Sequence, residues 1–160
     1  GCTSRRPALA NPCRGHVGVG PAVLGALPAE LPGTVDAVDG GTPGLETVLM
    51  LQGYDLVVVV DAAEMGLAPG SWRQFERDAI RMQTRDMALR GTLHYAGLAE
   101  ALALAEALDM LPPRITVFGV QPEDTGWAPG LSEPVRAAVE PVATAITAYL
   151  TREVTTKCDT

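Results

Sequence analysis

The sequence of 160 residues has few aromatic residues, fewer basic than acidic residues and no long apolar segment. Aromatic residues make up 4% of the chain, so Val, Leu and Ala must supply the hydrophobic core. The formal net charge of −7 argues against a nucleic-acid-binding protein, because contacts to phosphate groups require a basic surface. No apolar run approaches the roughly 18 residues of a transmembrane helix, so we expect no membrane span.

Cysteine is equally sparse, and its spacing forms no recognisable pattern. Cys2, Cys13 and Cys158 lie far apart and match neither a structural zinc motif nor a disulfide framework. Their spacing also gives no sign of a Cys–His nucleophilic pair. Because no disulfide framework is indicated, we expect a cytoplasmic protein.

What the sequence does contain is a run of β-branched residues that ends on a carboxylate. Residues 56–60 read Leu-Val-Val-Val-Val, and Asp61 follows directly. A continuous apolar run of this kind is typical of a strand covered on both faces of a parallel sheet. Such sheets bind ligands beyond the carboxyl ends of their strands. Asp61 is therefore a candidate site residue, although an aspartate that merely caps a turn would occupy the same place.

Strand and helix patterns alternate along the rest of the chain. We expect strands at 34–38, 55–60, 72–75 and 114–120, and helices at 18–27, 45–51, 92–110 and from 132 to about 150. This alternation predicts a single α/β domain, in which helices flank both faces of a twisted, mainly parallel sheet.

The amino-terminal residues do not fit this pattern. Residues 1–10 include two arginines and Pro7, which lacks the N–H group that a central strand requires. We therefore expect the first strand of the sheet to be missing or replaced, and residues 1–10 to be irregular. The domain is then expected to span residues 11–152, with a flexible tail at 153–160.

Carboxylates follow three of the predicted strands, at Asp39, Asp61 and Glu123. Because the carboxyl ends of parallel strands share one edge of the sheet, we expect these residues to gather there. His94 lies near the start of the helix predicted at 92–110, whose first turn faces the same edge. An imidazole and a carboxylate together suit a first-row transition metal such as nickel or zinc. Alternatively, His94 caps or packs against its helix, and Glu123 caps a turn.

Several short motifs occur in the order of one known family. They are Asn11-Pro12-Cys13-Arg14-Gly15, Gly18-Val19-Gly20, Asp39-Gly40-Gly41-Thr42, Val60-Asp61-Ala62, Leu93-His94 and Phe118-Gly119-Val120-Gln121-Pro122-Glu123. In these motifs the chain resembles the hydrogenase maturation endopeptidases, which trim the C-terminus of the large subunit of nickel–iron hydrogenases. The resemblance runs from about Asn11 to the last predicted helix.

The resemblance implies a metal-dependent endopeptidase that removes the C-terminal extension of a hydrogenase large-subunit precursor. The nickel carried by the precursor would be the recognition element, with Asp61 and His94 as its ligands and as the catalytic residues. Gly40, Gly41 and Thr42 would line the cleft that receives the C-terminal segment of the precursor. The peptide bond would break either because the metal polarises its carbonyl or because a carboxylate activates water.

One ligand of the family pattern is not present. Val17 stands where the family has a carboxylate, and Ala10 stands where it has glycine. The neighbouring His16 is a candidate substitute ligand, although its side chain leaves the backbone in another direction. We therefore expect weaker metal binding and impaired activity. The alternatives are a non-catalytic protein that binds a hydrogenase subunit and, on a weaker signal, a phosphate-binding domain at residues 18–20.

Overall fold

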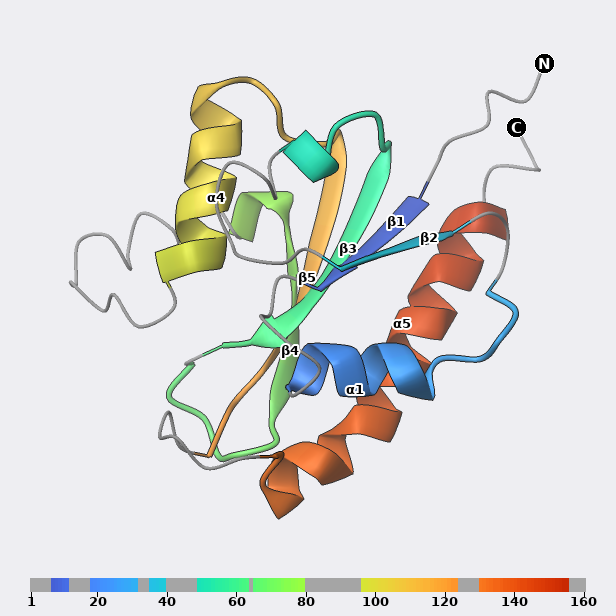
Figure 1. The fold of residues 1–160 in the computed structure, drawn as a ribbon, viewed down its shortest axis with the longest axis vertical. Coiled ribbons are helices and arrows are strands. Elements are labelled where there is room, and N and C mark those ends of the chain that lie inside the picture. The colour runs from blue at the N-terminus through green and yellow to red at the C-terminus, as the bar shows by residue number, and fades with distance from the viewer. Residues whose placement is uncertain are drawn as a thin grey trace.

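The described part of the chain folds around a five-stranded sheet (Figure 1). The computed structural model describes residues 7–11, 18–31, 35–39, 49–63, 65–79, 96–123 and 130–155. The strands are β1 (Pro7–Asn11), β2 (Asp36–Asp39), β3 (Leu56–Ala62), β4 (Trp72–Glu76) and β5 (Arg114–Val120). They lie in the order β2-β1-β3-β5-β4, and only β4, at one edge, runs antiparallel to its neighbour. The predicted α/β class with a mainly parallel sheet is confirmed.

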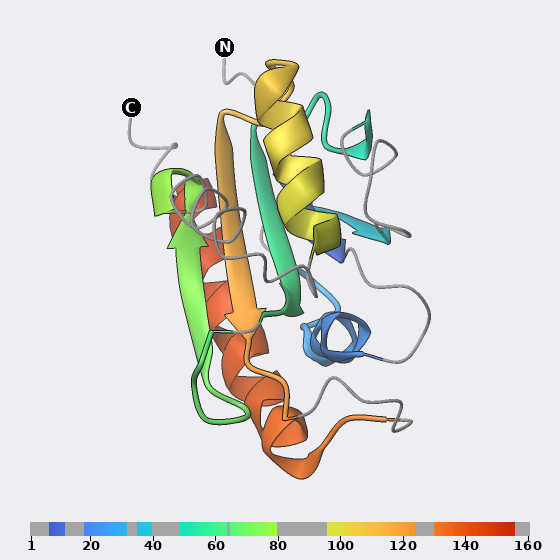
Figure 2. The ribbon, with the colours of Figure 1, turned by 90° about the vertical axis from the view of Figure 1, so that its left-hand side faces the viewer.

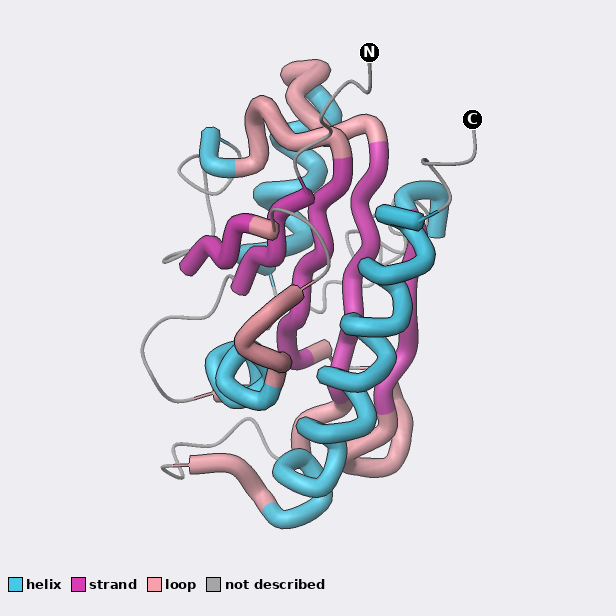
Figure 3. The backbone as a smooth tube through the Cα atoms, turned by 90° about the vertical axis from the view of Figure 1, so that its right-hand side faces the viewer, coloured by secondary structure: helices cyan, strands magenta, loops and turns pink. Residues whose placement is uncertain are grey.

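Helices cover both faces of this sheet. They are α1 (Val19–Ala26), α4 (Ala96–Ala107) and α5 (Glu133–Thr155). Leu56, Val58 and Val60 of β3 pack with α1 and α5, whereas Val57 and Val59 point to the opposite side and pack with α4. Figure 2 shows α4 in front of the sheet, and Figure 3 shows α5 and α1 on the other face. The valine run is thus buried on both sides, as its composition predicts.

The expectation of a missing first strand is wrong. Residues Pro7–Asn11 form β1, which lies between β2 and β3 and pairs in parallel with both. Pro7 is tolerated because it is the first residue of the strand, where the lost N–H group interrupts the ladder least. The expected boundary between an irregular segment 1–10 and a domain from residue 11 therefore cuts through a central strand.

The other elements agree more closely with expectation. The strand predicted at 114–120 coincides with β5, and the edge strand predicted at 72–75 is β4. The last helix, α5, extends to Thr155, past its expected end near 150 and past the expected domain boundary at 152. Within the described ranges, no helix is long and apolar enough to cross a membrane.

Candidate functional site

Asp61 lies at the carboxyl end of β3, beside the topological switch point of the sheet. At this point the connections from two adjacent strands lead in opposite directions. The chain that leaves β1 leads to β2 on one side, whereas the chain that leaves β3 leads to β4 and β5 on the other side. Open α/β sheets bind their ligands in the crevice outside the strand ends at such a switch point. The five residues before Asp61 are buried, and Asp61 is partly exposed. The fold therefore presents a carboxylate at the place where sites of this architecture are built.

The carboxylate of Asp61 is oriented by the backbone that follows it. Its Oδ1 atom accepts a hydrogen bond of 2.8 Å from the backbone N–H of Ala62. A charge-assisted hydrogen bond of this length restricts the rotation of the side chain. Asp61 is therefore suited to act as a metal ligand or as an acceptor of a proton or hydrogen bond.

The three carboxylates that follow predicted strands share one edge of the sheet, as expected. Asp39 is the last residue of β2, Asp61 lies near the end of β3, and Glu123 follows the end of β5. They do not form one cluster, however, because β1 lies between β2 and β3. With strands about 4.8 Å apart, the backbones of β2 and β3 are about 10 Å from each other. Glu123 is exposed, in keeping with a residue of a turn.

The remaining predicted site residues lie outside the described part of the chain. They are His16, Val17, Gly40, Gly41, Thr42 and His94. Among the described residues, no group of three or more His, Cys, Asp and Glu side chains could hold a metal ion. The pairing of Asp61 with His94 and the role of residues 40–42 therefore stay predictions.

Gln121 is the residue at this edge that the sequence did not single out for a role of its own. It follows β5 directly, and its side chain is buried, with 4% of its surface exposed. Its Oε1 atom accepts hydrogen bonds from the backbone N–H groups of Met65, at 2.7 Å, and Leu67, at 3.3 Å. Its Nε2 atom donates to the carbonyl oxygen of Pro122 at 3.3 Å. The amide thus links the end of β5 to the segment that follows Asp61.

Backbone hydrogen bonds join the same two segments. The N–H of Ala63 donates to the carbonyl of Val120, and the N–H of Gln121 donates to the carbonyl of Ser71. The N–H of Gly70 donates to the carbonyl of Gln121. Residues 63–71, which we call the β3–β4 loop, are therefore fastened to the end of β5 at both of their ends.

Two glycines permit this close approach. A Cβ atom on Gly119 would lie 2.9 Å from the Cβ of Ala63 and 3.3 Å from the ring of Phe75. Gly70 has a φ of +82°, and a Cβ atom there would lie 2.3 Å from the carbonyl oxygen of Pro134 in the first turn of α5. Side chains at either position would push the β3–β4 loop away from its supports.

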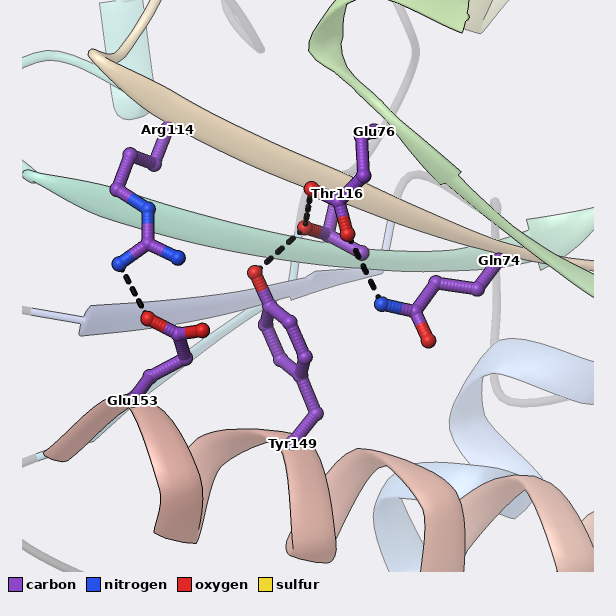
Figure 4. Close-up of polar contacts among 6 residues, drawn as sticks. All are labelled: Gln74, Glu76, Arg114, Thr116, Tyr149 and Glu153. Carbon is purple, nitrogen blue, oxygen red and sulfur yellow. Dashed lines mark hydrogen bonds and ion pairs between the residues drawn. The ribbon is translucent and has the colours of Figure 1, made fainter. Parts of the chain in front are cut away.

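A second polar cluster lies in the other half of β5 (Figure 4). Thr116 Oγ1 donates to Glu76 at 2.9 Å, so the hydroxyl of Tyr149, 2.8 Å away, must be the donor to Thr116. Arg114 and Glu153 form an ion pair beside it. Burial raises the pKa of the Tyr149 hydroxyl, and the carboxylates of Glu76 and Glu153 raise it further, while the positive charge of Arg114 opposes them. This cluster joins β4, β5 and α5, and we interpret it as structural.

An open groove on the surface lies apart from the candidate site. It runs between α5, β4 and the end of α1, and its lining includes Trp72, Gln74 and Thr147. Asp61 does not line it. The groove is therefore not part of the edge at which the carboxylates gather.

Comparison with known proteins identifies the family. The model of a family described as hydrogenase maturation protease matches residues 24–149. This stretch contains Asp61, His94 and residues 40–42, and it begins after His16 and Val17.

Two curated relatives are similar over most of the chain. The hydrogenase expression/formation protein HupD of Rhizobium leguminosarum bv. viciae is 36% identical over 111 residues, which is 69% of this chain and 54% of that protein. The hydrogenase expression/formation protein HupM of Azotobacter chroococcum mcd 1 is 39% identical over 123 residues, 74% of this chain and 56% of that protein. The chain thus spans about half the length of the curated relatives it matches.

A solved structure agrees with the fold. The hydrogenase maturating endopeptidase HybD from E. coli superposes with a TM-score of 0.75 at 25% identity, over 94% of each chain. Family model, curated relatives and solved structure point to the same group of proteins. The chain belongs to the hydrogenase maturation protease family.

Proposed function

We propose that this chain is an endopeptidase that removes the C-terminal extension of the large-subunit precursor of a nickel–iron hydrogenase. The observation that carries the proposal is the placement of Asp61, an oriented and partly exposed carboxylate at the switch point of the sheet, in a chain of this family. Peptide hydrolysis needs a polarised carbonyl and a group that takes a proton from water, and a carboxylate can serve the second task.

We further propose that nickel belongs to the substrate. The precursor would present its bound nickel at the sheet edge, where Asp61 and His94 would bind it and bring the scissile bond into position. A carboxylate and an imidazole are suitable ligands for this ion. Gly40, Gly41 and Thr42 would line the cleft for the C-terminal segment, and His16 would be a third ligand in place of the carboxylate that Val17 replaces.

The test is a processing assay with a nickel-loaded precursor, in which mass spectrometry measures release of the C-terminal extension. We expect Asp61→Asn to lower the cleavage rate by about a hundredfold or more, because the amide can neither accept the proton nor bind the metal as a carboxylate does. Asp55→Asn is the matched control, since Asp55 directly precedes β3 and lies at the opposite edge of the sheet. Cleavage at the normal rate by Asp61→Asn would overturn the proposal.

The altered loop favours a second candidate function, a non-catalytic protein that binds the hydrogenase subunit. Val17 cannot bind a metal, so nickel recognition would be weakened at this position. A stable complex with an uncleaved precursor would support this alternative. Replacement of His16 by Asp together with Val17 by Glu restores the family pattern, and we expect it to raise the cleavage rate if the chain is an impaired protease.

A further inference from the structure

We propose that Gln121 is a positioning residue, which sets the location of Asp61 and of the β3–β4 loop for binding of the precursor. The inference rests on the proposed function, because it assumes that Asp61 contacts the nickel-bearing precursor. Gln121 itself touches no substrate in this proposal. It acts through the backbone that follows Asp61.

The contacts of Gln121 carry the argument. Its Oε1 atom accepts hydrogen bonds from two alternate N–H groups of the loop, those of Met65 and Leu67, which lie more than fifty residues earlier in the sequence. Backbone hydrogen bonds fasten the two ends of the loop to the end of β5, and the Gln121 side chain adds a contact to the residues between those ends. A buried amide of this kind is stable because its oxygen and its nitrogen both have partners.

The backbone held by these contacts is only a few residues from Asp61 in the sequence. Asp61 Oδ1 is bonded to the N–H of Ala62, and the next N–H, of Ala63, is bonded to Val120, the residue before Gln121. The carboxylate is therefore bonded to a stretch of backbone that is held by hydrogen bonds to the Val120 carbonyl and to the Gln121 side chain. If the Gln121 amide is lost, the loop loses one of these supports and Asp61 gains freedom of movement.

The neutral amide of glutamine suits position 121 better than a methionine or a glutamate side chain would. A methionine of similar length would fill the space but would leave the N–H groups of Met65 and Leu67 without their acceptor. A glutamate would keep the acceptor oxygen but would place a buried negative charge near the edge that carries the partly exposed Asp61. Gln121→Met therefore removes the contact, and Gln121→Glu retains the acceptor.

The first measurement is hydrogen exchange, which does not depend on activity. In Gln121→Met we expect the amides of Met65 and Leu67 to exchange about tenfold faster, the equivalent of about one lost hydrogen bond. Exchange at Val58, in the buried part of β3, should be unchanged. Gln121→Glu should keep most of the protection at Met65. Unchanged exchange at Met65 and Leu67 in Gln121→Met overturns the proposal.

The second measurement is the dissociation constant for the nickel-loaded precursor, in a double-mutant cycle with Asp61→Asn. We expect Gln121→Met to weaken binding about tenfold in the normal chain and to have no further effect in the Asp61→Asn chain, because both changes act through one carboxylate. Thr116→Val is the matched control. Thr116 lies in β5, the strand that leads to Gln121, and is fully buried, but its hydroxyl contacts Glu76 and Tyr149 rather than the loop, so binding should be unaffected.

The outcomes separate the two proposals. If Asp61→Asn weakens binding and Gln121→Met does not, Gln121 has no positioning role and the proposed function survives. If Asp61→Asn has no effect on binding, the role of Asp61 in recognition fails and the inference on Gln121 fails with it. Equal weakening by Gln121→Met and Thr116→Val would mean a general structural effect, and this too overturns the proposal.

Discussion

The two ends of β5 are stabilised in different ways, although they belong to one buried strand. In its first half, Arg114 and Thr116 contact side chains of α5 and β4, namely Glu153, Tyr149 and Glu76. At and just beyond its carboxyl end, Val120 and Gln121 form hydrogen bonds with the backbone of the β3–β4 loop. The first half therefore joins regular elements to each other, whereas the second half shapes an irregular segment next to Asp61.

This difference shows that one end of a strand can contribute to folding stability while the other end determines the geometry of a site. Side chains that join helix to sheet can be exchanged for others at a cost in folding free energy. An irregular loop has no ladder of its own, so its shape depends on particular hydrogen bonds and on glycines that allow close contact. Substitutions at the two ends of β5 should therefore have separable effects on stability and on precursor cleavage.

The largest effect should come from a loop glycine. We expect Gly70→Ala to lower the free energy of unfolding by about 3 kcal/mol, since it combines a left-handed backbone conformation with a clash against Pro134. Urea denaturation measures the change. Gly53 is the matched control, because its φ of +81° is nearly the same but a Cβ atom there meets nothing within 4 Å. Gly53→Ala should cost about 1 kcal/mol, and equal losses for the two variants would contradict the role of the contact with α5.

A smaller effect is expected at the opposite end of β5. Thr116→Val preserves the shape of the side chain but removes the hydroxyl that links Tyr149 to Glu76. We expect a loss of about 1–2 kcal/mol in the free energy of unfolding, measured by urea denaturation. The rate of precursor cleavage should not change at temperatures where the variant is fully folded. A large fall in that rate would show that the two ends of β5 are not separable.

The smallest expected effect is on the pH dependence of the free energy of unfolding. Burial raises the pKa of Tyr149, so the folded chain keeps the phenolic proton at a pH where the unfolded chain, with a pKa near 10, has released it. The resulting stability is fully present below pH 10 and is lost as the pH rises above it. Thermal unfolding at pH 8 to 11 should therefore show a smaller alkaline loss in Tyr149→Phe than in the normal chain. The opposite order would mean that Tyr149 is not the group responsible.

Sequence patterns were sufficient for the strands buried on both faces. The valine run of β3 and the apolar residues of β5 have a composition that few other structures accommodate, and the carboxylates after them had to share an edge once the strands were parallel. Asp61 could therefore be placed from the sequence alone.

Local sequence patterns do not reveal the first strand or the contacts of Gln121, because both depend on partners that are distant in the sequence. Pro7–Asn11 has too few apolar residues to indicate a strand, and it is stabilised by pairing with β2 and β3, whose positions local sequence does not reveal. Gln121 lies within the motif at residues 118–123, but its partners Met65 and Leu67 are distant in sequence. The one sign of its contacts in the sequence is its position, as a polar residue directly after a buried strand and before a proline.

The central position of β1 has a consequence for protein engineering. β1 ends at Asn11 in the middle of the sheet, and Gly18 directly precedes α1, so the six residues 12–17 join two positions that the structure defines. A segment of equal length from an active relative could be grafted between these points without alteration of either anchor. The stretch with His16 and Val17 can thus be exchanged as one unit.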